Sequence, residues 1–194
     1  MPITTDTIKQ LRDATGVSVM QCKKALEEAG GDMEKAIVIL RKIAAAGASK
    51  KSDRVLDAGI VAAYTHAGGQ VVAAVVLGCE TDFVSRNPEF QKMAYDIALH
   101  IAAMQPQFVS REQVKETDIA KAREVFEQEA TSVPEAMRTK AVEGKLDAFF
   151  KEKVLLDQPF VKDAEITIRQ LIENGVQKFG EKIEVVRMER LSVK

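Results

Sequence analysis

The chain has 194 residues, 46% of them hydrophobic, and 28 Lys and Arg residues nearly balance 29 Asp and Glu residues. This composition predicts a folded protein of one or two domains and excludes a disordered chain. Balanced charge argues against nucleic acid as the direct partner. No apolar run approaches the roughly 18 residues that span a bilayer, so we expect no membrane contact.

The N-terminus and the cysteines indicate the compartment. The first residues form neither the basic nor the apolar part of a targeting signal. Cys22 and Cys79 lie far apart in unlike surroundings, which favours reduced structural thiols over a disulfide or a metal site. We therefore expect a cytoplasmic protein, most simply in a bacterial cytosol, although a chain already stripped of a transit peptide would look the same.

Residues 1–46 have the pattern of three short helices. Ser18 and Gln21 have the spacing of a capping box, in which the serine oxygen accepts a backbone N–H and the glutamine returns to the cap. Asp32 can cap the third helix. The sequence therefore predicts an N-terminal three-helix module over residues 1–46, with a small, polar linker or helix tail over 47–55.

The periodicity then changes to that of β-strands. Residues 60–65 and 71–77 are rich in Val and Ala and flank the turn Ala67-Gly68-Gly69, a β-hairpin pattern. A further strand over 183–188 is the natural third member, because a two-stranded hairpin alone is marginal in water. These segments predict a small antiparallel sheet.

Helical patterns dominate the rest of the chain. Asn87 and Pro88 begin a long helix that Pro106 closes, and Ser110 with Gln113 repeats the capping-box spacing. Further helical runs are predicted over 117–129, 134–153 and 163–179. Residues 56–194 are therefore predicted to form an α+β core whose sheet is covered by helices on one face. The other face is unassigned and would suit a second sheet from another subunit.

No segment carries an enzyme or nucleotide-binding motif. Gly144 and Lys145 stand together, but the glycine that a phosphate-binding loop needs five residues earlier is Thr139. HExxH, paired CxxC, GxSxG and dinucleotide-binding patterns are likewise missing. His66 reads as a solvated turn residue, and neither it nor His100 has an evident catalytic partner. We expect no enzyme activity, no cofactor and no metal.

The end of the second predicted strand carries the residues that are hardest to explain. Cys79 lacks the base or cationic neighbour that would activate a thiol, so a buried structural cysteine is the favoured reading. Glu80 and Asp82 alone offer too few oxygen ligands for a hard cation. Phe83 stands among acidic and polar neighbours, and periodicity alone favours a core position for it.

Several sequence stretches together resemble the bacterial translation elongation factor Ts family. They are Leu11-Arg12-Asp13-Ala14-Thr15-Gly16, Met20-Gln21-Cys22-Lys23-Lys24-Ala25-Leu26, Gly31-Asp32, Cys79-Glu80-Thr81-Asp82-Phe83-Val84 and Gln158-Pro159-Phe160-Val161-Lys162-Asp163. The resemblance runs from near the start almost to the final strand. It implies an N-terminal module similar to ubiquitin-associated domains, followed by the α+β core.

The resemblance also implies a function. Members of the family exchange guanine nucleotide on elongation factor Tu, and the sequence Thr81-Asp82-Phe83-Val84 matches the segment whose aromatic residue enters the GTPase domain near its magnesium site. By the same resemblance Val19 and Met20 contact that domain, although Val19 could also pack in the module core. His100 matches a core histidine that approaches the partner.

The sequence departs from the family pattern in three places. Gly16-Val17-Ser18 stands where Gly-x-Gly is usual, and Gln21 replaces an aspartate before the cysteine. The chain also has one hairpin only, like the short members, which implies a homodimer formed through the core sheet. Two rival readings stay open: a plain protein-interaction module with a ubiquitin-like partner, and a thiol enzyme that uses Cys79.

Overall fold

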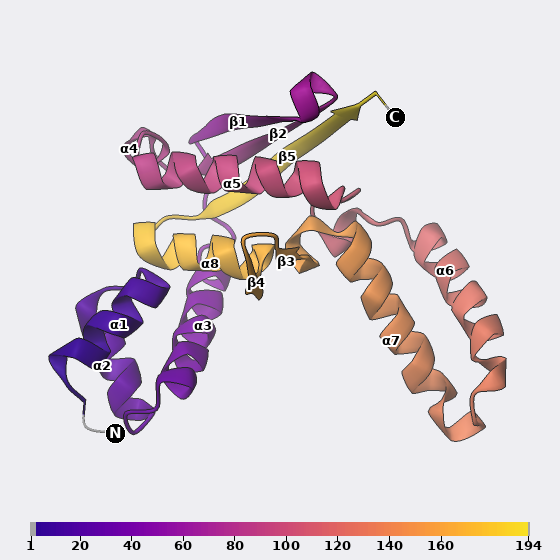
Figure 1. Cartoon of the computed structure of the whole chain (residues 1–194), viewed down its shortest axis with the longest axis horizontal. Coiled ribbons are helices and arrows are strands. Elements are labelled where there is room, and N and C mark those ends of the chain that lie inside the picture. The colour runs from indigo at the N-terminus through magenta and orange to yellow at the C-terminus, as the bar shows by residue number, and fades with distance from the viewer. Residues whose placement is uncertain (1–2, 194) are drawn as a thin grey trace.

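The computed structural model describes residues 3–193. The N-terminal module consists of α1 (Thr5–Thr15), α2 (Val19–Glu28) and α3 (Met33–Ser49) (Figure 1). Apolar side chains at helical spacing bring the three helices together. The buried residues of this small core are Leu11, Val17, Cys22, Ala25, Leu26, Ala36 and Leu40.

Side-chain caps fix where these helices begin. Asp32 Oδ1 accepts a hydrogen bond from the Lys35 backbone N–H at 3.1 Å, as predicted for the start of α3. Ser18 Oγ accepts the Gln21 N–H at 3.4 Å, but Gln21 Oε1 accepts from the Ser18 hydroxyl at 3.2 Å. The glutamine thus engages the serine side chain, and the predicted capping box of α2 is only half formed.

The segment after α3 is partly helical. The helix continues to Ser49, and Ala48 packs against the main buried cluster of the α+β core. The expected linker therefore begins as a helix tail. Farther on, the Ser52 carbonyl accepts a hydrogen bond from Lys182 Nζ at 2.6 Å, and Arg54 pairs with Glu80 at 3.1 Å. The chain therefore enters the core through a segment that is held by specific contacts.

A three-stranded antiparallel sheet forms the centre of the α+β core, as predicted. Its strands are β1 (Ala58–His66), β2 (Val71–Cys79) and β5 (Ile183–Ser192), in the order β1-β2-β5. Val61 lies opposite Val76, and the register between β2 and β5 shifts after Val76. The last strand continues beyond the predicted 183–188.

Helices cover one face of this sheet. α5 (Pro88–Met104) packs on β1 and β2, and α8 (Ile168–Phe179) lies on the other side of α5 from the sheet and also contacts β5 (Figure 1). The inward-facing side chains of β2, at Ala73, Val75 and Leu77, are fully buried under these helices. The opposite face of the sheet has no covering layer among residues 3–193.

A helical hairpin projects from the core. It consists of α6 (Glu116–Glu129) and α7 (Glu135–Lys153), which close on a separate small cluster around Ala130, Val142 and Leu146 (Figure 1). Short elements complete the chain: α4 (Asp82–Ser85), β3 (Pro159–Phe160), β4 (Asp163–Thr167) and single 3₁₀ turns at 67–69, 111–113, 130–132 and 155–157.

Two local predictions were wrong. Residues 163–167 are not helical but form β4, and α8 begins after Thr167, whose side chain makes a complete capping box with Gln170. Ser110 makes no side-chain cap. Gln113 Oε1 instead accepts the Val109 N–H at 2.8 Å, and the next helix begins at Glu116.

Candidate partner-binding site

A one-turn helix, α4, carries Phe83, a highly exposed aromatic residue of the core. The Thr81 hydroxyl caps it by accepting the Val84 N–H at 3.4 Å. Val84 is only 3% exposed and packs in the main core, whereas its neighbour Phe83 is 82% exposed. Val84 therefore anchors the turn in the core, and Phe83 displays a large apolar ring to solvent. This exposure overturns the core position that periodicity alone favours for Phe83.

Asp82 lies beside this ring at the first position of α4. Its Oδ2 pairs with Arg86 Nη2 at 3.0 Å, and both side chains are largely exposed. Such a surface ion pair contributes little to the stability of the fold, so either side chain can leave it for another partner at small cost in free energy. Asp82 is thus available to a cationic or hydrogen-bonding group that approaches Phe83.

A reciprocal set of hydrogen bonds fixes the chain just before α4. Glu181 Oε2 accepts the backbone N–H groups of Glu80 at 3.1 Å and Thr81 at 3.0 Å, and its Oε1 accepts the Thr81 hydroxyl at 2.6 Å. In return, Glu80 accepts the Lys182 backbone N–H and pairs with Arg54. The Lys182 N–H, followed by Arg54, holds the pKa of Glu80 below its ordinary value.

Sequence reasoning missed Glu181 as a member of this site. It lies about 100 residues from Thr81 along the chain, just before β5, and no local motif marks it. Only the antiparallel pairing of Cys79 with Ile183 at the end of β2 brings the two segments together.

The exposed residues of the module lie on the first turn of α2. Val19 is 55% exposed and Met20 68% exposed, whereas Val17 and Cys22 on either side are buried. Val19 therefore packs little in the module core. Figure 1 shows the module and α4 at the same, left-hand end of the molecule.

His100 occupies a different position from the exposed residues. Its side chain is fully buried on α5, with Nε2 2.9 Å from Gln158 Oε1 and Nδ1 accepting the Val161 N–H at 3.2 Å. Burial lowers the pKa of the imidazole, so the ring is neutral at pH 7. The structure therefore does not bring His100 to the surface with Phe83; it ties the 158–161 segment to α5.

The other polar candidates have structural surroundings. Cys79 is fully buried, and this burial raises the pKa of its thiol, which is the opposite of nucleophile activation. His66 is exposed and lies 3.1 Å from Tyr64 Oη through Nδ1. Within residues 3–193, no three acidic, His or Cys side chains gather as a metal site, and no helix has the length and apolar character needed to cross a bilayer.

Comparison with known proteins places these features in one family. The family model described as elongation factor TS matches residues 10–194. The elongation factor Ts of Carboxydothermus hydrogenoformans is 46% identical over 193 residues, covering 98% of this chain and 89% of that protein. That of Desulforamulus reducens is 45% identical over 190 residues, 97% and 88% of the two chains. That of Pseudothermotoga lettingae is 44% identical over 195 residues, 100% and 98%. The chain therefore belongs to the elongation factor Ts family.

Proposed function

We propose that this protein is a guanine-nucleotide exchange factor that binds elongation factor Tu and promotes GDP release during translation elongation in the cytoplasm. The observation that carries the proposal is Phe83, which is 82% exposed on a turn that Val84 and Glu181 hold in place. Exposed large aromatic residues on rigid supports are typical anchors of protein interfaces. Family membership identifies the GTPase as the partner.

The energetic requirement is a difference in affinity. An exchange factor binds the nucleotide-free GTPase more tightly than the nucleotide-bound form, and linkage then weakens nucleotide binding by the same factor. A thousandfold weakening corresponds to roughly 4 kcal/mol. Burying one Phe side chain contributes about 1.5–3 kcal/mol, so Phe83 supplies a large part of that difference if its ring is buried only in the nucleotide-free complex.

The neighbours of Phe83 have distinct roles in this proposal. The ring enters the GTPase domain near its magnesium site, where it disturbs the metal and phosphate contacts. Asp82 contributes a carboxylate at the same point, because its ion pair with Arg86 is exposed. Thr81 and Val84 hold the turn, through its cap and its anchor in the core.

The N-terminal module supplies a second contact in the same proposal. Val19 and Met20 present apolar surface at the start of α2, where the module core below keeps the backbone in place. Met is well suited to such a surface because its flexible thioether adapts to the partner. Two separate contacts with one partner also fix its orientation relative to Phe83.

The experiment that tests the function measures release of fluorescent GDP from elongation factor Tu in a stopped-flow instrument. Catalytic amounts of this protein, with excess unlabelled GDP, should accelerate the fluorescence decay. Decay no faster than that of the GTPase alone, with a folded protein and a partner from the same organism, contradicts the proposal. Binding to a ubiquitin-like protein without any effect on the GTPase would favour the plain interaction module.

Glu181 provides a separate test of how α4 is held. Glu181→Ala removes three acceptor contacts, to the N–H groups of Glu80 and Thr81 and to the Thr81 hydroxyl, without touching the exposed ring. We expect the exchange rate constant to fall by about tenfold, since lost positioning equivalent to about 1.4 kcal/mol has that effect.

The matched control for Glu181→Ala is Glu184→Ala. Glu184 lies at the start of β5, shortly after Glu181, and its ion pair with Lys182 is exposed on the Glu184 side. Exchange should be unchanged in this variant. Equal activity of the two variants would show that the Glu181 contacts do not position α4.

We further propose that two copies of the chain form a homodimer through the uncovered face of the core sheet. Val61 is 67% exposed, Val186 53% and Leu191 70%, and these residues lie on β1 and β5. The central part of the face is small: Ala63 lies opposite Ala74, and Gly59 opposite Gly78. The β5 row of the same face also carries the exposed ion pair of Arg187 and Glu189, opposite Val76 and Ala74. Two sheets whose facing residues are mostly small and apolar can approach to about 10 Å and pack as a sandwich.

A further inference from the structure

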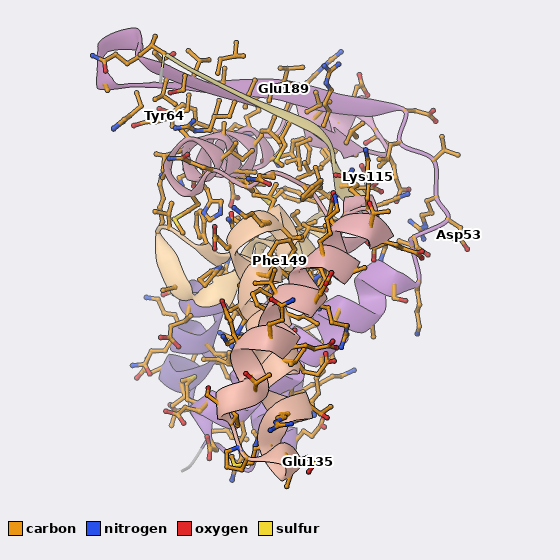
Figure 2. All side chains as sticks on the ribbon, turned by 90° about the vertical axis from the view of Figure 1, so that its right-hand side faces the viewer. Asp53, Tyr64, Lys115, Glu135, Phe149 and Glu189 are labelled. Atoms are coloured by element: carbon orange, nitrogen blue, oxygen red, sulfur yellow. The ribbon has the colours of Figure 1, made fainter. Side chains whose placement is uncertain are left out.

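A cavity of about 260 Å³ lies on α8, away from the residues of the proposed exchange site. Its walls come from the end of α3 at Ala48, the loop at Ser110 and Gln113, and the beginning of β5. We call it the α8 cavity. In Figure 2 the labelled residues Asp53 and Lys115 lie on the same side of the molecule. They come shortly after Ala48 and Gln113 in the sequence. None of Thr81, Phe83, Val19 and Met20 lines it.

One wall of the α8 cavity carries a carboxylate without a direct partner. Glu173 lines the cavity, and among residues 3–193 its side chain forms neither a hydrogen bond nor an ion pair. Burial raises its pKa above the ordinary value, and the charge of Arg169 opposes that shift only in part. A half-buried carboxylate that lacks a partner costs free energy, so a cation beside it would be stabilised.

The other charged groups around the cavity are already paired. Arg169 Nη2 lies 3.2 Å from Asp157 Oδ1, and Glu184 Oε2 lies 3.2 Å from Lys182 Nζ. Neither Arg169 nor Lys182 therefore forms an ion pair with Glu173. The remaining lining is mainly apolar, with Val109, Leu156, Ile172 and Val185.

The same side of α8 carries an unsatisfied buried amide, that of Gln177. Gln177 follows Glu173 by four residues, so the two side chains lie on one side of the helix. Both the oxygen and the nitrogen of the Gln177 amide are buried without a hydrogen-bond partner among the described residues. Unsatisfied buried groups are rare in native proteins, and the Gln177 amide is one, a turn along α8 from Glu173 and outside the lining of the cavity.

From this arrangement we propose that the α8 cavity binds a guanidinium or ammonium group on a short aliphatic stem, with Glu173 as its counter-ion. The carboxylate accepts charge-assisted hydrogen bonds from the cation, and the apolar walls cover the stem. The volume limits the ligand to a small molecule or a single side chain. The inference does not depend on the proposed exchange function.

Two sources of this chemistry are distinguished by geometry. Among residues 3–193, β5 is an edge strand of the β1-β2-β5 sheet, and its first residues border the cavity. An arginine or lysine side chain presented by an extended peptide can therefore gain backbone hydrogen bonds along β5 as well as the Glu173 contact. A free amine or guanidine makes only the second contact.

The experiment is a titration followed by two-dimensional amide NMR of the full-length protein. The probe is butylguanidinium, added up to about 20 mM because a single charged contact in a small cavity supports roughly millimolar affinity. The neutral isostere butylurea is titrated in parallel, and a capped Ala-Arg-Ala peptide represents the protein source. The protein variants are Glu173→Gln, Glu173→Asp and the control Glu127→Gln, which changes an exposed glutamate on α6.

We expect butylguanidinium to shift the amides of Ser110, Gln113 and Glu184, and butylurea to have little effect. Glu173→Gln should weaken binding by at least about tenfold, since charge-assisted hydrogen bonds are roughly twice as strong as neutral ones. Glu173→Asp should retain part of the affinity, and Glu127→Gln all of it. Tighter binding of the peptide, with added shifts along β5, identifies a protein side chain as the ligand; equal affinity identifies a free small molecule.

Three outcomes would overturn the proposal. They are no saturable shifts at the cavity, equal binding of butylurea and butylguanidinium, and undiminished binding by a folded Glu173→Gln variant. The amide spectrum of each variant reports its folding in the same measurement. Because the readout is binding at α8, failure here leaves the exchange assay unaffected, and failure of exchange leaves this site unaffected.

Discussion

Replacing Phe83 with alanine is expected to lower the rate constant of stimulated GDP release by on the order of 100-fold, the effect of losing a buried anchor worth about 2.7 kcal/mol. The ring is 82% exposed in the free protein, so its removal leaves no cavity in the core. The free energy of unfolding should change by less than about 0.5 kcal/mol, as is usual for surface positions. Stopped-flow exchange and thermal unfolding measure the two quantities separately.

The control for this substitution is Val125→Ala. Val125 is 50% exposed on α6, in the hairpin that projects on the other side of the core from α4. It should leave both exchange and stability nearly unchanged. A large loss of stability in Phe83→Ala with normal exchange would contradict the anchoring role. It would show that the ring packs within the free protein and does not contact the partner.

The hairpin of the sheet was predictable from local pattern, because the turn Ala67-Gly68-Gly69 separates two segments rich in Val and Ala. The predicted segments 60–65 and 71–77 fall inside β1 and β2, and each observed strand is longer than its predicted segment. The third strand followed from a physical requirement, namely that a hairpin alone is marginal in water. The long helix that follows the hairpin was also located, since Asn87 and Pro88 form a recognisable start.

The error at residues 163–167 shows how a period can be misread. Ile166 and Ile168 alternate with polar residues, which is a strand pattern. The apolar residues that follow have helical spacing, and treating residues 163–179 as one segment assigned the strand residues to the helix. Thr167 and Gln170 are a capping-box pair and mark the true start of α8. That signal was present in the sequence, so the boundary could have been found.

Other features had no local signal. The direction of His100 on α5 depends on Gln158 and Val161, which come from a segment that the sequence alone does not place. Glu181 and Glu173 look like ordinary helix or loop glutamates until the fold brings their neighbours together. Phe83 is the opposite case, since periodicity favoured burial and only the family resemblance indicated exposure.

The dimer proposal leads to the second large effect, at the uncovered face of the sheet. Val61→Asp places a carboxylate on β1 within the proposed interface, opposite Val76; Arg187 is the next residue in this row, and it is already paired with Glu189. Burying an unpaired charge costs several kcal/mol. We expect the dimer dissociation constant to rise by at least about 100-fold, which corresponds to about 2.7 kcal/mol. Folding should be nearly unaffected, because Val61 is 67% exposed in the single chain.

Analytical ultracentrifugation over a range of concentrations measures this change directly. The wild-type protein should sediment with twice the chain mass of 21.3 kDa, and Val61→Asp with the mass of one chain. Val125→Asp introduces the same charge at a similarly exposed valine on α6 and should remain dimeric. A wild-type protein that is monomeric throughout would sink the dimer proposal. A Val61→Asp variant that stays dimeric would move the interface to another surface, because two sheets cannot pack closely around an unpaired pair of aspartates.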